Sequence, residues 1–166
     1  ITGVKEVKML GLESPYLLIT EENIPMVRGA SQVFGLSFIP GTWVESMQVT
    51  KGVGSVVNGF ESISGQVNIE LNKPISDVPT FVNVFRNNMG RNEFNFHLNR
   101  ILNEKLSTGL FIHADQRKET HDDNSDGFLD SPIVEGYNIF NRWQLTDLER
   151  GLVGFFGIKF MKNEKK

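Results

Sequence analysis

The chain has 166 residues, no cysteine, and 20 acidic against 17 basic side chains, which give a formal net charge of -3 at pH 7. The lack of cysteine excludes disulfides, thiol nucleophiles and cysteine-ligated metal sites, and the mildly acidic balance offers no basic field for nucleic acid. No apolar run approaches the roughly 18 residues of a membrane-spanning helix, which excludes a helical span and leaves a β-barrel open, because barrel strands give a weaker, alternating signal.

Short strands and turns are predicted in the first part of the chain. Val4–Leu10 alternates between apolar and polar residues, Tyr16–Thr20 is apolar, and Phe34–Ile39 is apolar between turns. The first segment has the period of a half-buried strand, and the other two are short enough for buried strands.

The segment from Trp43 to Pro74 carries the clearest pattern. Trp43–Lys51 alternates with a period of two, and Gly65–Leu71 alternates again, so both are predicted strands. The glycines between them indicate a compact, turn-rich excursion, and Pro74 ends the second strand because proline cannot donate to a ladder. One face of the first strand is expected to carry Trp43, Glu45, Met47, Val49 and Lys51.

Short motifs in this region follow one another in a fixed order. They are an Arg-Gly pair, a strand that ends in a basic residue and glycine, a turn glycine, and a glycine before a Val-Asn-Ile strand. The residues are Arg28, Gly29, Lys51, Gly52, Gly59, Gly65 and Asn68. This order resembles the C-terminal half of the plug domain of TonB-dependent outer-membrane receptors, by motif over roughly residues 1–74.

The sequence also departs from that family. Nothing in it resembles the N-terminal energy-coupling box, and such plugged barrels have about 22 strands, whereas this chain shows only a few strand patterns. The sequence is therefore expected to be a piece of a larger receptor. Residues 1–76 would be the C-terminal part of the plug, and residues 77–166 would be about the first five strands of the barrel.

The pattern becomes regular after a stiff, polar connector at Lys73–Pro79. The predicted strands are 81–87, 93–102, 108–119, 137–145 and 152–161. In the second of them Phe94, Phe96 and Leu98 share one face, and Glu93, Asn95, His97 and Asn99 share the other. The strands are near ten residues long against a usual 5 to 6, which favours a barrel over a soluble sheet. The expected fold is mainly β: a mixed α+β plug segment followed by antiparallel transmembrane strands of an incomplete barrel.

An acidic loop interrupts these strands. Residues 122–130 fit the pattern D-x-N-x-D-G-x-x-D, which places oxygens where a calcium loop needs them and glycine at the sharp turn. The candidate ligands are Asp122, Asn124, Asp126, the Phe128 carbonyl and Asp130. The closing glutamate of an EF-hand is absent, with Ile133 in its place, so an Asx-rich loop without an ion is the alternative.

Catalytic interpretations have little support. Gly52-Val53-Gly54 lacks the third glycine of a dinucleotide fingerprint, and the required long helix is cut by Gly59 and Gly65. His113 and Asp115 lie two apart on one strand face, as a base and its orienting group can, but a polar barrel lumen explains them better. The sequence therefore predicts no enzyme.

The resemblance implies active import of a scarce nutrient by energy-coupled rearrangement of the plug, in the outer membrane of a Gram-negative bacterium. It implies these partners: a TonB-type complex that engages an upstream segment, the rest of the same barrel, outer-membrane lipid and a small nutrient whose identity these residues do not reveal. The alternative is a soluble all-β binding module, calcium-stabilised and directed to carbohydrate. Further ten-residue strands and an upstream coupling box in the adjoining sequence would separate the two.

Overall fold

The computed structural model describes residues 7–120, 122, 125–127 and 129–165. The chain separates into two compact units, the first ending at Asn72 and the second beginning at Lys73. The first unit here means the described residues 7–72, and the strand unit means the described residues from Lys73 onward. The change of unit falls at the start of the connector Lys73–Pro79.

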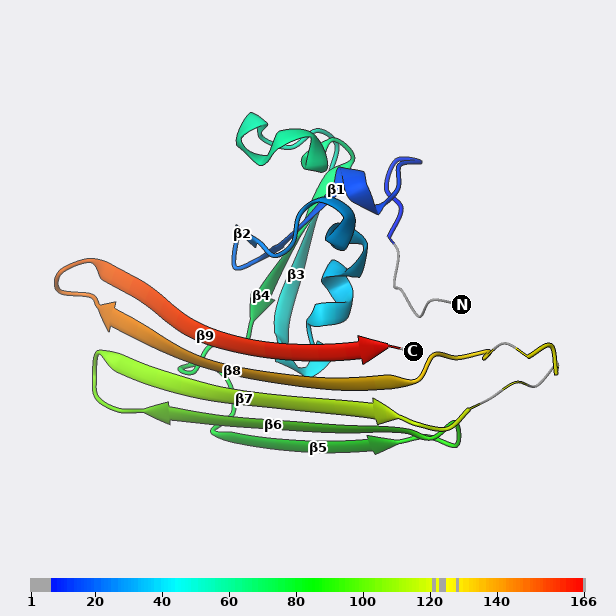
Figure 1. Ribbon diagram of the computed structural model, residues 1–166. Coiled ribbons are helices and arrows are strands. Elements are labelled where there is room, and N and C mark those ends of the chain that lie inside the picture. Colours follow the sequence, from blue (N-terminus) through cyan, green and yellow to red (C-terminus); the bar gives the residue numbers. More distant parts are fainter. Residues whose placement is uncertain (1–6, 121, 123–124, 128, 166) are drawn as a thin grey trace. The chain divides into compact units, whose positions relative to one another are not determined.

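The first unit is built on a four-stranded sheet (Figure 1). Its strands are β1 (Leu17–Glu21), β2 (Ile24–Pro25), β3 (Val44–Lys51) and β4 (Gly65–Leu71), in the order β2-β1-β4-β3. β1 and β4 pair in parallel, and the other pairs are antiparallel. The helical segments are 3-10 turns: η1 (Ser14–Tyr16), η2 (Gly29–Phe38), η3 (Gly41–Trp43) and η4 (Val56–Ser62).

The two central strands form the core of the first unit. The buried apolar side chains are Met9, Leu17, Leu18, Ile19, Trp43, Val67, Ile69 and Leu71. β4 spans the predicted residues, and β1 is the predicted apolar segment displaced by one residue. Phe34 to Phe38 instead belong to η2, and the described part of Val4–Leu10 forms only an isolated bridge between Met9 and Leu12.

The face prediction for β3 is wrong at its start. A bulge between Val44 and Ser46 shifts the register, so the alternation of side chains is not continuous through Glu45. Trp43 lies in η3 rather than in the strand and is fully buried. A bulge inserts one residue without disturbing the local apolar pattern, so the pattern alone predicts an alternation that continues through it.

The strand unit is a five-stranded antiparallel meander in the order β5-β6-β7-β8-β9 (Figure 1). The strands are β5 (Thr80–Arg86), β6 (Arg91–Ile101), β7 (Leu106–Arg117), β8 (Val134–Asp147) and β9 (Leu152–Lys165). Three connections are tight, and the one between β7 and β8 is long. This arrangement confirms the predicted antiparallel strands, and β8 and β9 extend beyond the predicted bounds to 14 residues each.

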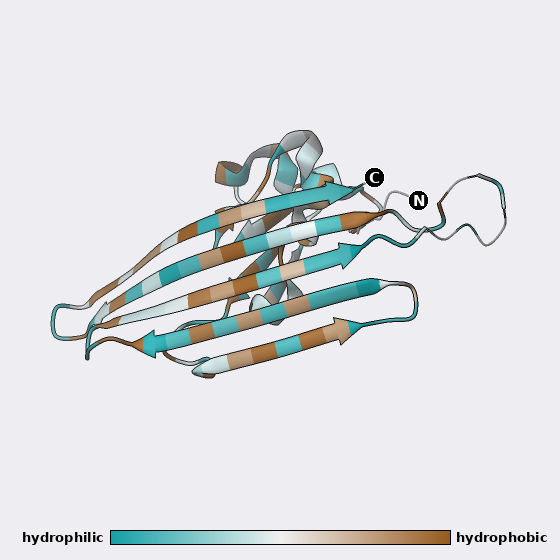
Figure 2. Ribbon diagram, turned by 60° about the horizontal axis from the view of Figure 1, so that its bottom comes forward, coloured by the Kyte–Doolittle hydropathy of each residue, from teal (hydrophilic) through white to brown (hydrophobic). Residues whose placement is uncertain are grey.

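Alternation persists across the whole strand unit (Figure 2). One row of directly paired residues across all five strands is Val82, Phe96, Ile112, Ile139 and Phe160. The adjacent row, on the opposite face, is Asn83, Asn95, His113, Asn138 and Met161. Because side chains in a strand alternate between faces, the first row makes one face apolar, and the second row makes the other face polar from β5 to β8, where β9 adds Met161.

Candidate functional site

The Arg-Gly pair of the plug-like motif binds a carboxylate. Gly29 N donates to Glu61 Oε1 at 2.9 Å, and Arg28 Nη1 donates to Glu61 Oε2 at 3.2 Å. The side chain of Glu61 is 6% exposed and that of Arg28 is 54% exposed. A buried carboxylate needs hydrogen-bond partners, and these two contacts provide them. Gly29 has a φ of 66°, a conformation that favours glycine, so both residues of the pair have a physical role.

Glu61 is the residue that the sequence did not identify. It lies in η4, 32 residues from Gly29 and 33 from Arg28. The contact therefore joins the start of η2 to the excursion between β3 and β4. Glycine at position 59, where φ is 69°, breaks η4 two residues earlier and sets the direction of the turn that carries Glu61.

The glycines after Lys51 allow close backbone approach. Gly52 N donates to Ser64 O at 3.1 Å, and Gly54 N donates to Ser62 O at 2.8 Å, which closes the excursion onto itself. A Cβ at Gly65 would collide with the carbonyl oxygen of Thr50 and with Met9 Sδ. Lys51 is paired with Gly65 and is itself exposed. The glycines are thus required by packing, and Lys51 presents a cation at the end of β3.

Asn68 holds the hairpin between β1 and β2. Its Oδ1 accepts hydrogen bonds from Thr20 Oγ1 at 2.8 Å and from Asn23 N at 2.9 Å. Glu22 and Asn23 have φ values of 53° and 64°, as in a two-residue type I′ turn. Asn68 is 3% exposed, so its position on central β4 lets one buried amide order the neighbouring turn.

The motif residues therefore fall into separate local structures. Arg28 and Gly29 meet at Glu61, the glycines at 52, 59 and 65 shape the excursion, and Asn68 supports the β1–β2 turn. Nothing in these contacts forms a catalytic arrangement. The Glu61 contacts tie two loop segments to each other, and the Asn68 contacts tie a turn to a central strand of the sheet.

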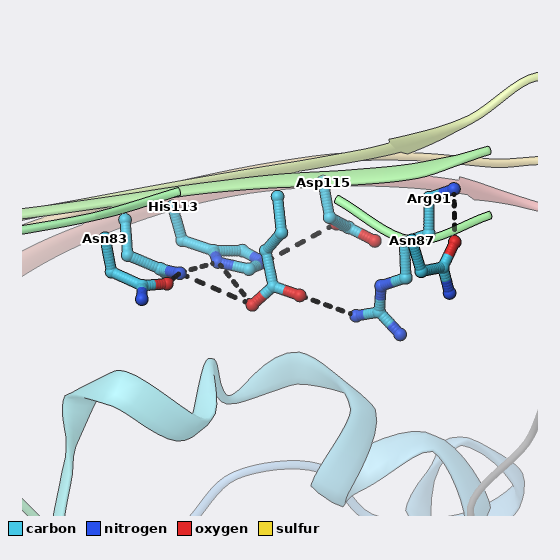
Figure 3. A network of polar contacts seen from close by, with 7 residues as sticks. Asn83, Asn87, Arg91, His113 and Asp115 are labelled. Atoms are coloured by element: carbon cyan, nitrogen blue, oxygen red, sulfur yellow. Dashed lines mark hydrogen bonds and ion pairs between the residues drawn. The ribbon is translucent and has the colours of Figure 1, made fainter. Parts of the chain in front are cut away.

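A second polar cluster lies on β5, β6 and β7 of the strand unit (Figure 3). His113 Nδ1 lies 2.7 Å from Asn95 Oδ1 and 3.9 Å from Glu93 Oε1, and His113 Nε2 lies 3.5 Å from Asp115 Oδ1. Arg91 Nη2 donates to Glu93 Oε2 at 3.0 Å. His113 and Asp115 thus share a face as predicted, within a larger network of amides and charges that extends across the strands.

The polar face continues along the strands beyond this cluster. It is defined by the following residues: Asn83, Asn95, His97, Asn99, Ser107, Phe111, His113, Asp115, Asn138, Phe140, Arg142 and Gln144. Arg142 lies over two rings, with its guanidinium carbon 5.4 Å from the centroid of Phe155 and 6.0 Å from that of Phe140. Hydrogen bonds and cation-π contacts satisfy part of this face. Among the described residues, the buried atoms His97 Nε2, Ser107 Oγ, Asn138 Oδ1 and Gln144 Oε1 have no hydrogen-bond partner.

The acidic loop is only partly described. Asp122 accepts hydrogen bonds from Asp126 N at 3.1 Å on Oδ1 and from Gly127 N at 3.0 Å on Oδ2. Asn124 and Phe128, two of the predicted calcium ligands, lie outside the described residues, as does His121. Asp122 thus accepts from backbone amides four and five residues later, which closes this part of the loop, and the calcium site stays a prediction.

Two general findings apply to the described parts of the chain. Among those residues, no group of three or more His, Asp or Glu side chains is arranged to hold a metal ion. No helical segment within them is long and apolar enough to cross a membrane.

Comparison with known proteins adds no relative. No protein-family model matches the chain, and no curated protein matches it significantly. The functional argument consequently depends on the residues and contacts described above.

Proposed function

We propose that this chain is part of a TonB-dependent outer-membrane receptor. Residues 1–76 would be the C-terminal part of its plug domain, and residues 77–166 would be the first strands of its barrel. The receptor would import a scarce small nutrient from outside the cell. A TonB-type complex acting through an upstream segment would rearrange the plug to open a path.

The observation that carries this proposal is the distribution of side chains in the strand unit, which exposes large apolar residues and buries polar ones. Its apolar face includes large exposed side chains: Val82 is 60% exposed, Phe156 62% and Phe160 62%. Its polar face contains buried amides and imidazoles, among them Asn95, which is fully buried, and His97, which is 1% exposed. Barrel strands in a bilayer need this distribution, apolar toward lipid and polar toward the lumen.

Strand length supports the same proposal. A transmembrane strand needs about 9–11 residues, and β6 to β9 have between 11 and 14. β5 and β9 are the two edges of the sheet among the described strands. Because an unpaired edge does not persist in hydrocarbon, each of them would pair with a further strand of the same barrel.

The first unit supports the plug assignment through its contacts. Its motif residues tie the start of η2 to η4 through the Glu61 contacts, and they tie the β1–β2 turn to β4 through the Asn68 contacts. A domain with a small core and loops held by a few hydrogen bonds can be rearranged piece by piece. That property suits a plug which must open without complete unfolding of the receptor.

The alternative, a soluble all-β binding module, predicts a different distribution of side chains. Such a module would bury its large apolar residues between two layers. In the described strand unit, Phe111 is the single large apolar side chain in the buried class, whereas many apolar side chains of the opposite face are exposed. We therefore favour the membrane assignment.

Cell fractionation of the full-length protein tests the proposal. A tagged protein expressed in a Gram-negative host should be recovered with the outer membrane and should resist extraction by urea and alkaline carbonate. It should also migrate differently in a denaturing gel before and after heating, as folded barrels do. Recovery in the soluble fraction after lysis without detergent would overturn the membrane assignment and favour the soluble module.

A further inference from the structure

The connector Lys73–Pro79 is bound to the strand unit by one asparagine of β6. Asn99 Nδ2 donates to Asp77 Oδ2 and to Val78 O, both at 2.8 Å, and Asn99 N donates to Pro79 O at 2.9 Å. Asn99 is 3% exposed. Three hydrogen bonds from one buried residue thus hold three successive residues of the connector against the sheet.

The other end of the connector lies over a glycine of β7. Pro74 is buried, and its Cγ would lie 3.2 Å from a Cβ placed on Gly109. That Cβ would also lie 2.6 Å from Asn99 Oδ1. Asn99 and Gly109 are directly paired across β6 and β7, so both contacts fall on one cross-strand pair. A glycine inside a strand weakens the strand unless another group approaches closely, and here Asn99, Phe111 and Pro74 do so.

Aromatic rings support the Asp77 contact. His97 Nδ1 lies 3.5 Å from Asp77 Oδ2, and the His97 ring lies between those of Phe81 and Phe111, with centroid separations of 4.9 and 4.7 Å. The side chain of Asp77 is 14% exposed. The carboxylate is therefore held between two partners, of which Asn99 is the closer.

Hydrogen bonds hold the residues on both sides of the peptide bond between Asn72 and Lys73, which joins the two units. On the first side, Asn72 N donates to Trp43 O at 2.8 Å, and Asn72 Nδ2 donates to Thr42 O at 3.0 Å. On the second, Lys73 O accepts hydrogen bonds from Ser76 N at 3.1 Å and Asp77 N at 2.9 Å. Each of these two residues thus has hydrogen bonds within its own unit.

We propose that Pro74–Pro79 is a strap fixed to the strand unit, that Asn99 is its positioning residue, and that the first unit pivots at Asn72–Lys73. The strap remains docked while the first unit moves or loosens. A few residues at the end of an element commonly absorb such a change of backbone angle. β4, a central strand of the first unit, ends one residue before the pivot. The proposal does not depend on import or on the membrane.

Spin labels on the full-length protein test the strap. A label at Ser76, an exposed position, should give the spectrum of slow, restricted motion. A pair of labels at Ser76 and Arg100 should give one narrow distance distribution. In mild urea, the pair Asn58–Arg100, which joins the two units, should broaden several-fold while the Ser76–Arg100 distribution stays narrow.

Variants identify the residue responsible. Asn99→Ala and Asp77→Ala should each increase the mobility of the Ser76 label several-fold. The effect of the double variant should be smaller than the sum of the two, because both single variants remove the Asn99–Asp77 contact. Asn92→Ala, on the exposed start of β6, is the matched control and should leave the spectrum unchanged. Preserved heat-dependent gel migration or protease resistance of the strand unit would show that the variants fold.

Either of two results would overturn the proposal. The first is a Ser76 label that is already mobile in the unmodified protein. The second is a Ser76–Arg100 distribution that broadens together with the Asn58–Arg100 distribution. Failure of the strap would leave fractionation with the outer membrane unaffected, so the two proposals fail separately.

Discussion

The two units of this protein bury opposite kinds of side chain. In the first unit, Leu17, Ile19, Val67 and Ile69 lie at 3% exposure or less, as in an ordinary soluble domain. In the strand unit, the buried set consists mainly of amides, imidazoles and hydroxyls, and most of the exposed large apolar residues of the strands lie on the opposite face. The same chain thus contains one unit with an apolar core and one unit whose strands expose many large apolar side chains.

Arginine on the apolar face should give the largest effect if that face meets lipid. Phe96→Arg places a charge near the middle of β6 and should destabilise the folded protein in a bilayer by about 2–4 kcal/mol. Asn92→Arg lies on the same face near the strand end and should cost less than about 1 kcal/mol. Denaturant titration in lipid vesicles measures both. Equal costs at the two positions would contradict a depth-dependent lipid face.

Substitution of Gly65 should give the next largest loss of stability, and the loss should be confined to the first unit. Gly65→Ala places a Cβ against the carbonyl of Thr50, which cannot move without disturbing the β3–β4 pair. We expect a loss of about 2–3 kcal/mol. Gly41→Ala is the control, because nothing lies within 4 Å of a Cβ there, and it should change stability by less than about 0.5 kcal/mol.

The fluorescence of Trp43 in a Trp143→Phe background can report unfolding of the first unit, because Trp43 is fully buried there. If Gly65→Ala and Gly41→Ala gave the same unfolding midpoint, the close approach described at Gly65 would be wrong.

Loss of the Glu61 carboxylate should have a smaller effect. Glu61→Gln keeps the shape but removes the charge that accepts from Gly29 N and Arg28, so a loss of about 1.5 kcal/mol is expected. Glu13→Gln, at an exposed pair with Lys8, should cost less than about 0.5 kcal/mol. Hydrogen exchange at the Gly29 amide should rise several-fold in Glu61→Gln. Unchanged protection of that amide would show that Glu61 does not hold it.

The acidic loop should give the smallest change in stability. If calcium binds there, the ion should protect residues 120–135 of the intact protein from protease, and Asp126→Ala should abolish that protection while altering global stability by less than about 1 kcal/mol. Cleavage can be compared with calcium and with a chelator. If the cleavage were the same under both conditions, only the interpretation as an Asx-rich loop without an ion would remain.

The regular part of the fold was predictable from sequence because its signal is local. Each strand of β5 to β9 carries its own period of two, so the sequence alone assigns Phe94, Phe96 and Leu98 to one face. The bulge at Val44–Ser46 and the 3-10 turns of η2 were not predictable, because a bulge and an aperiodic helical segment leave the local apolar pattern ambiguous.

The site was predictable only in part. Gly29, Gly52, Gly59 and Gly65 were identified, and each adopts a positive φ. Glu61 and Asn99 were not identified as binding residues, because their partners are 32 and 22 residues away and no local pattern encodes such a pairing. A long-range hydrogen bond is decided by the topology that brings two segments together, which a single sequence does not specify.

The central claim is that the two faces of the strand unit meet different surroundings, and a label scan along β6 tests it most directly. Single spin labels at successive positions 93 to 99 of the full-length protein, reconstituted in vesicles, can be exposed to oxygen and to a water-soluble paramagnetic reagent. Labels at Phe94, Phe96 and Leu98 should be accessible to oxygen and not to the polar reagent. Labels at Asn95, His97 and Asn99 should be less accessible to oxygen, and their oxygen access should not follow the depth of the residue in the bilayer. Equal access to the polar reagent at Phe96 and His97 would contradict the membrane assignment of this strand.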